Sequence, residues 1–75
     1  MVIPKRLPNL AAAAIRNGWC VEVLHLKDGI DAEFWRDRDR VILAWSLDAR
    51  LTDSEINNVP TPYADCVRLI KEDQE

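Results

Sequence analysis

The chain has 75 residues, of which 48% are hydrophobic and 31% charged, a mixture typical of one globular domain over residues 1–75. Its net charge is −3, but the first 30 residues hold four basic against two acidic side chains (+2), and residues 51–75 hold two against six (−4). Such a balance excludes a strongly basic nucleic-acid binder. No apolar run approaches the roughly 20 residues that span a bilayer, and no signal peptide is evident, which predicts no membrane partner and a cytoplasmic protein.

Residue types that carry chemistry are scarce in this sequence. His25 is the only histidine, and Cys20 and Cys66 are far apart without a CxxC pair, so we expect no metal and no cofactor. Two reduced thiols are expected, with a Cys20–Cys66 disulfide as the alternative. No acid, base or nucleophile is visibly paired with a partner, and His25 suits a structural role, so the chain is predicted not to be an enzyme.

The elements can be taken in chain order. Residues 1–8 contain two prolines and predict an extended N-terminal arm, followed by an alanine-rich helix over Leu10–Asn17 that Gly18 ends. β-Branched and aromatic residues then predict three strands, with Asp28-Gly29 as the first hairpin turn. The strands are expected over Trp19–Leu26, Asp31–Arg36 and Val41–Leu47.

The last third of the chain predicts two helical segments. Thr52 and Glu55 have the spacing of a capping box, which predicts a brief helix ended by residues 57–60. Thr61 then caps a final helix with Pro62 at its first position, running to Asp73. The predicted fold is α+β: a three-stranded antiparallel meander with helices on one face, in the order α-β-β-β-(short helix)-α.

Two-residue loops at Asp28-Gly29 and Arg38-Asp39 would pair Phe34 with both Val23 and Leu43. Because side chains alternate with period two, these loops define two faces of the sheet. The predicted core face carries Val21, Val23, Ala32, Phe34, Val41, Leu43 and Trp45. Trp19 is expected to join this core at the corner between helix and strand.

The opposite face is predicted to expose an apolar stripe. It holds Leu24, Trp35 and Ile42, edged by Glu22 and Glu33, and two short helices cannot cover it. A contiguous apolar stripe with a charged rim is typical of a binding surface. The occupant is left open between another protein, a second copy of the chain, and the chain's own arm at Val2-Ile3.

The segment FWRDRDRV places three arginines among aspartates. Arg36, Arg38 and Arg40 fall around the second predicted turn, where a solvated hairpin tip neutralised by Asp37 and Asp39 is expected. The alternative is a nucleic-acid-binding surface in which these arginines contact phosphates together with basic residues of the N-terminal third.

Two resemblances follow from these residues. The order α-β-β-β-α is similar to that of double-stranded-RNA-binding domains. Those domains carry a basic cluster at the start of the last helix, but the matching residues 61–65 read TPYAD here, which argues against RNA binding.

The run NGWC…DG…FWRDRDRV…AWSLDARLT, roughly residues 10–56, resembles small uncharacterised accessory proteins of bacteriophages of actinobacteria. That resemblance implies a phage accessory protein acting in the host cytoplasm on a host or phage protein, and it implies no reaction.

From the sequence we therefore expect a small, non-enzymatic protein-binding or regulatory module. Its predicted contact surface is the stripe of Leu24, Trp35 and Ile42 with Glu22 and Glu33, used for a protein partner or for a homodimer.

Overall fold

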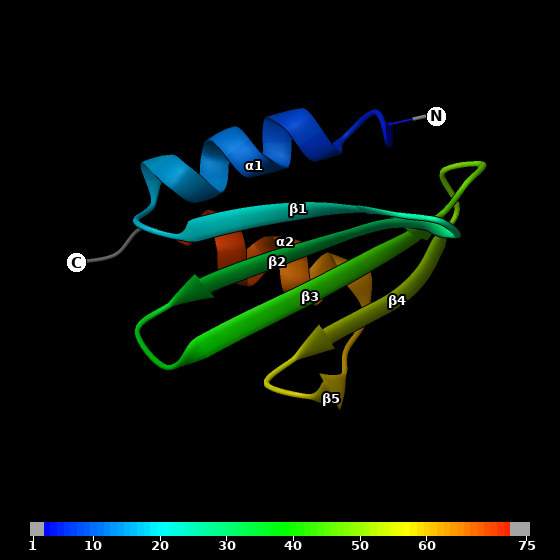
Figure 1. The fold of residues 1–75 in the computed structure, drawn as a ribbon. Helices are drawn as coiled ribbons and strands as arrows, with labels where there is room; N and C mark the ends of the chain where they lie inside the picture. The colour runs from blue at the N-terminus through cyan, green and yellow to red at the C-terminus, as the bar shows by residue number, and fades with distance from the viewer. Residues whose placement is uncertain (1–2, 73–75) are drawn as a thin grey trace.

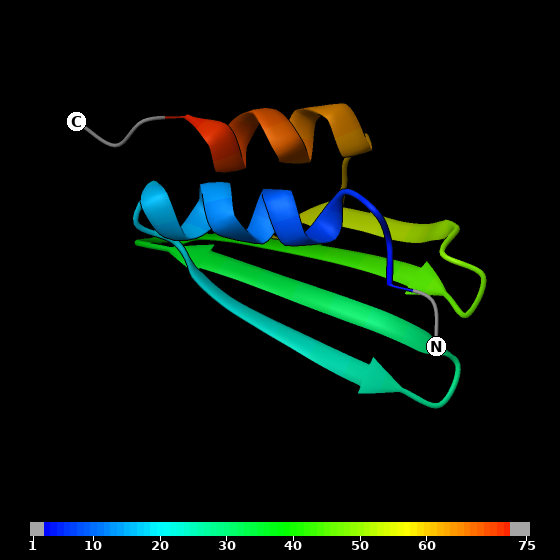
Figure 2. The ribbon, with the colours of Figure 1, turned by 90° about the horizontal axis from the view of Figure 1, so that it is seen from above.

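The computed structural model describes residues 3–72, and it is α+β with a single antiparallel sheet (Figure 1). The elements are α1 (Leu7–Arg16), β1 (Cys20–Leu26), β2 (Gly29–Arg36), β3 (Asp39–Ser46), β4 (Leu51–Ile56), β5 (Val59–Pro60) and α2 (Tyr63–Lys71). The strands lie in the order β1-β2-β3-β4-β5. Both helices lie on one face of the sheet (Figure 2), so the opposite face has no covering layer among the described residues.

The prediction of a three-stranded sheet with a short helix at Thr52–Glu55 was wrong. Those residues lie in β4, which pairs with β3 and then turns through Asn57 and Asn58 into β5. Both asparagines have positive φ, 52° and 68°, the conformation of a type I′ hairpin turn. The strand is favoured because a capping box satisfies main-chain groups in only one turn of helix. Pairing with β3 satisfies main-chain groups along a whole strand.

The sheet register differs from the prediction by two residues in both hairpins. The turns are Lys27-Asp28 and Asp37-Arg38, so Phe34 pairs with Val21 and Val41. A shift of two keeps every side chain on its predicted face, because the period is two.

The core lies between the sheet and the two helices. The predicted core face is confirmed: its β2 and β3 members are buried, Val21 and Val23 are half-buried, and Trp19 and Trp45 are 3% and 7% exposed. The helices add small and branched side chains to this cluster, namely Leu7, Leu10, Ala14, Cys66 and Ile70.

The helix boundaries differ modestly from those expected. α1 begins at Leu7, so Leu7 and Pro8, expected in the arm, form its first turn, where proline is tolerated because its missing N–H has no helical acceptor. α2 runs from Tyr63 to Lys71, and Asp73, its expected end, lies outside the described residues. Neither described helix is long and apolar enough to cross a membrane.

Candidate functional site

The uncovered face of the sheet, here called the outer face, is the most distinctive surface of the described chain. It is built from alternate residues of four strands. They are Cys20, Glu22, Leu24 and Leu26 of β1, Asp31, Glu33 and Trp35 of β2, Arg40, Ile42, Ala44 and Ser46 of β3, and Asp53 and Glu55 of β4.

All five residues predicted to form the contact surface lie on the outer face. Leu24 and Trp35 are each 39% exposed, which is high for large apolar side chains in a sheet, and Ile42 is half-buried. The structure does not place the three apolar residues in one unbroken stripe. Trp35 pairs across the sheet with Cys20 and Arg40, and the row Glu22–Glu33–Ile42–Glu55 separates it from Leu24. The surface is therefore a set of apolar side chains interleaved with carboxylates.

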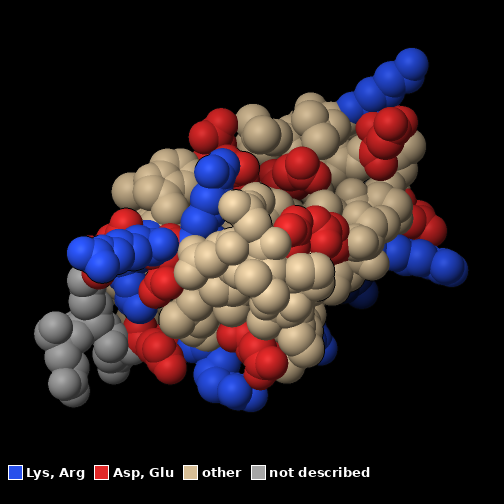
Figure 3. Space-filling model, turned by 90° about the horizontal axis from the view of Figure 1, so that it is seen from below, with Lys and Arg blue, Asp and Glu red and all other residues tan. Residues whose placement is uncertain are grey.

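The outer face is strongly acidic. It carries five carboxylates, on Glu22, Asp31, Glu33, Asp53 and Glu55, against one guanidinium, on Arg40. Seen from below, acidic side chains are spread among uncharged ones across the middle of the surface, while most basic side chains project near its margin (Figure 3). Acidic side chains therefore gather on the outer face, and most basic side chains lie elsewhere on the molecule.

A shallow hollow of about 430 Å³ lies on the outer face around Trp35. Glu22, Glu33, Trp35 and Arg40 line it, and Arg40 Nη2 lies 2.7 Å from Glu33 Oε1. The Arg40 side chain is 56% exposed, so this ion pair contributes little to stability. Glu22 makes no ion pair within residues 3–72. The hollow therefore offers an aromatic face beside a carboxylate that has no cation of its own, an arrangement that suits a cationic side chain.

Asp53 and Glu55 form a second acidic position on the outer face. They are two residues apart on β4, and a hydrogen bond to Asp53 raises the pKa of Glu55, with partial desolvation and the negative charge of Asp53 acting in the same direction. Because the pKa of Glu55 is higher in the folded than in the unfolded chain, its protonation stabilises the fold at pH values below the unfolded-state pKa. This stabilisation is lost as the pH rises through the folded-state pKa. The two carboxyl groups therefore disfavour each other's negative charge, and a bound cation would reduce this repulsion.

We expect Asp53→Asn to lower the pKa of Glu55 towards its ordinary value, because the substitution removes the carboxyl group whose hydrogen bond, and secondly whose negative charge, raises that pKa. Carbon-detected NMR titration of the side-chain carboxyls would measure this. Glu22→Gln is the matched control: it also removes an outer-face charge, but β2 and β3 separate it from Glu55. An equal shift of the Glu55 pKa in both variants would contradict a local pair.

The three arginines of the central segment do not form one surface. Arg36 lies on the helix side, where its Nη1 donates to the backbone oxygens of Asn17 and Glu72 at 2.7 and 3.2 Å. Arg38 lies in the exposed turn, and Arg40 lies on the outer face with Glu33. Only Arg38 lies in a solvated hairpin tip, as was predicted for all three arginines. The alternative, a nucleic-acid-binding surface, would need the three arginine side chains on one side of the sheet.

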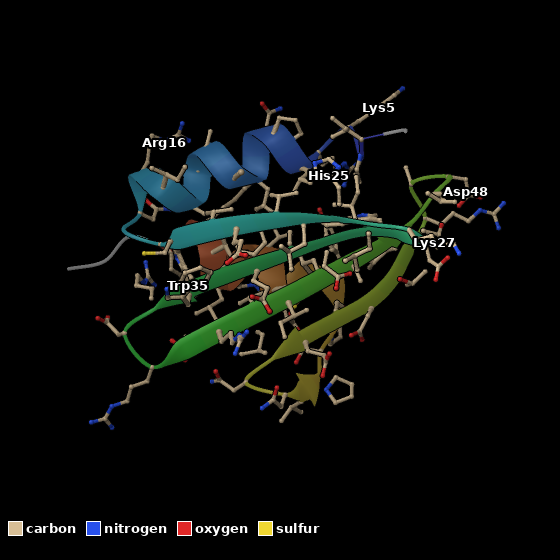
Figure 4. All side chains as sticks on the ribbon, in the orientation of Figure 1. Lys5, Arg16, His25, Lys27, Trp35 and Asp48 are labelled. Carbon is tan, nitrogen blue, oxygen red and sulfur yellow. The ribbon has the colours of Figure 1, made fainter. Side chains whose placement is uncertain are left out.

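The groups considered for catalysis are not brought together. His25 is exposed near the end of β1 (Figure 4). Cys20 and Cys66 are free thiols, one exposed and one buried, so the alternative of a disulfide is wrong. Burial raises the pKa of the Cys66 thiol, which opposes formation of a reactive thiolate. Among residues 3–72, no three His, Cys, Asp or Glu side chains are arranged to hold a metal ion.

Sequence reasoning missed part of the outer face. Asp53 and Glu55 belong to it, but the predicted short helix removed them from the sheet. The signal that could have placed them is Asn57-Asn58, a pair suited to a type I′ turn between two strands. Arg40 was missed because a loop at Arg38-Asp39 made it part of the tip.

The chain was compared with known proteins at three levels. No protein-family model, curated protein or solved structure matches it. The resemblance to actinobacteriophage accessory proteins therefore stays a prediction.

Proposed function

We propose that this protein is a non-enzymatic binding module whose outer face docks onto a positively charged surface of another protein. The observation that carries the proposal is the composition of an uncovered sheet face: exposed Leu24 and Trp35 among five carboxylates and one arginine. The aromatic and aliphatic side chains would supply the buried contact area, and the carboxylates would select basic partners and steer them to the face.

Charge also favours one of the three candidates that could cover the outer face: a second copy of the chain, the chain's own arm, or another protein. Two copies meeting outer face to outer face would set carboxylates against carboxylates, an arrangement that opposes association. The chain's own arm is a poor occupant as well, because Ile3 is 53% exposed, and Val2 lies outside the described residues. A basic protein surface, such as one that normally binds nucleic acid, is complementary in both charge and apolar content. If the chain is phage-encoded, that protein would belong to the host or the phage.

Trp35→Ala is expected to weaken partner binding by about 2 kcal/mol, roughly thirtyfold, because it removes an exposed aromatic anchor from the contact. Proteins captured on the immobilised wild-type chain would be identified, and the affinity of purified partner for each variant measured by calorimetry. Leu47→Ala is the matched control, since Leu47 is 51% exposed but lies in the loop after β3.

Two results would count against the proposal. One is a partner that binds Trp35→Ala as tightly as the wild type. The other is a wild-type dimer in light scattering that Trp35→Glu converts to a folded monomer, which would mean that the outer face is used for self-association. A basic partner whose affinity falls as salt is added would support the proposal, because the contacts are charged.

A further inference from the structure

The two edges of the sheet are protected to very different degrees. At the β5 edge, the last strand has only two residues and contains Pro60, and β4 has a bulge where Trp45 pairs with Leu51. Short strands, prolines and bulges prevent an edge from pairing with another chain. At the other edge, β1 has seven residues, unbroken pairing with β2, and neither proline nor lysine. This edge lacks the usual protection.

The turn between β1 and β2 determines which main-chain groups of β1 remain open. Leu26 pairs with Gly29 across two turn residues, and the closing pair of such a hairpin exchanges both of its hydrogen bonds. Bonded pairs then recur at every second residue, at Leu24 and Glu22. The N–H and C=O groups of Val21 and Val23 therefore point away from β2, towards the open edge.

α1 presents an apolar flank on the same side of the molecule as this edge. Arg6 and Asn9 of its N-terminal end line a hollow with Tyr63 and Val67 of α2, so that flank faces the other helix. Ala11 and Ile15, four residues apart, lie on the opposite flank, and Ile15 is 64% exposed. α1 and β1 lie side by side at this margin (Figures 1 and 2).

We propose that the β1 edge binds an extended segment of another protein, which adds a sixth strand to the sheet. Main-chain bonds to Val21 and Val23 would hold the segment, and its side chains would alternate between the two faces. Those on the helix side would lie beside Val23 and Ile15, and those on the outer side would lie beside Glu22. The segment that fits therefore alternates apolar residues with lysine or arginine.

Charge favours such a segment over a second copy of the chain. β1 itself carries Glu22 on its outer side and no lysine or arginine. Two β1 strands pairing through a two-fold axis would also extend one acidic outer face with another. A basic strand instead gives the unpaired Glu22 carboxylate a cation. This site needs the main chain of β1, so it does not depend on the outer-face proposal.

The test uses the full chain and a seven-residue, end-capped peptide that alternates valine and lysine. In NMR titration, the amide signals of Val21 and Val23 should shift and their hydrogen exchange should slow as the peptide is added. Val23→Pro should lower peptide affinity roughly tenfold or more, because it removes an edge N–H and its main-chain bond. The variant should still fold, since proline is tolerated where a strand N–H faces solvent. Val23→Thr keeps the N–H and should bind like the wild type.

Each other outcome overturns the inference in a recognisable way. Equal binding to Val23→Pro would place the peptide on acidic side chains away from the edge. Slow exchange of the Val21 and Val23 amides in the free protein, together with a doubled solution mass, would mean that a second copy occupies the edge. No amide shift at millimolar peptide would mean that the edge does not accept a strand. Asp53→Asn removes an outer-face carboxylate that β2 and β3 separate from β1, so it should leave peptide binding unchanged, which separates this site from the outer-face contact.

Discussion

Gly29→Ala is expected to remove most of the stability of this protein. Gly29 has a φ of 156°, and a Cβ built on it would lie 2.0 Å from the backbone oxygen of Trp45 on β3. No rotation of a side chain can relieve this contact, because the obstructing atom is main chain. The sheet would have to separate at the first residue of β2, where the β1–β2 turn joins the central strands.

The expected cost is about 3–5 kcal/mol, the sum of backbone strain and overpacking in a site that cannot yield. A domain of this size has a total stability near the low end of about 5–15 kcal/mol, so the variant should be largely unfolded near physiological temperature. Urea unfolding followed by tryptophan fluorescence would measure it.

Gly18→Ala provides the matched control for this prediction. Gly18 also has a positive φ, 87°, so alanine there carries backbone strain of about 1–2 kcal/mol. The difference between the two variants isolates the contact with Trp45. Similar losses of stability in both would mean that strain alone determines the requirement for glycine, and that the sheet adjusts to the added carbon.

The two faces of the sheet could be predicted from the sequence because they depend only on period. The alternation in β2 and β3 puts Phe34, Leu43 and Trp45 on one side and Trp35 and Ile42 on the other, whatever the exact turn. The register error of two residues shows this directly: the pairs changed while the faces did not. For the same reason, all five predicted contact residues lie on the outer face.

The number of strands could not be obtained in the same way. In residues 51–60, a capping-box pattern and a strand pattern compete, and each is consistent with local propensity. Pairing with the edge of β3 decides between them, because it satisfies main-chain groups of both strands along their length. This is a requirement of the assembled sheet, which a local reading of Thr52 and Glu55 does not contain.

The role of Arg36 was also beyond a local reading. Its neighbours in the sequence are charged turn residues, which indicate a solvated tip, but its partners lie at the ends of two helices. Asn17 and Glu72 are 19 and 36 residues away. Long-range contacts of this kind depend on where the helices end, and helix ends are the least certain feature of a sequence-based prediction.

Arg36→Ala is expected to cost about 2–3 kcal/mol, the second largest effect that we predict. The Arg36 guanidinium lies 4.6 Å from the centre of the buried Trp19 ring and donates to the backbone oxygens of Asn17 and Glu72, the residues that directly follow α1 and α2. A cation there interacts favourably with both helix dipoles, and its hydrogen bonds are charge-assisted. Asn17 Nδ2 also donates to the backbone oxygen of Ile70 at 3.1 Å, so the two helices are joined at the same corner. Loss of Arg36 should therefore loosen both helices together.

The neighbouring arginine provides the control for this prediction. Arg38→Ala lies two residues away in the exposed turn and should change stability by less than about 0.5 kcal/mol. Arg36→Lys should fall between the two, because lysine keeps the charge but cannot stack a planar group on Trp19 while donating to two carbonyls. In a domain of this length, the loss for Arg36→Ala corresponds to a fall in Tm of roughly 10–20 °C by calorimetry. If Arg36→Ala and Arg38→Ala unfold at the same temperature, the corner does not depend on the guanidinium, and Arg36 is free to contact a ligand such as phosphate.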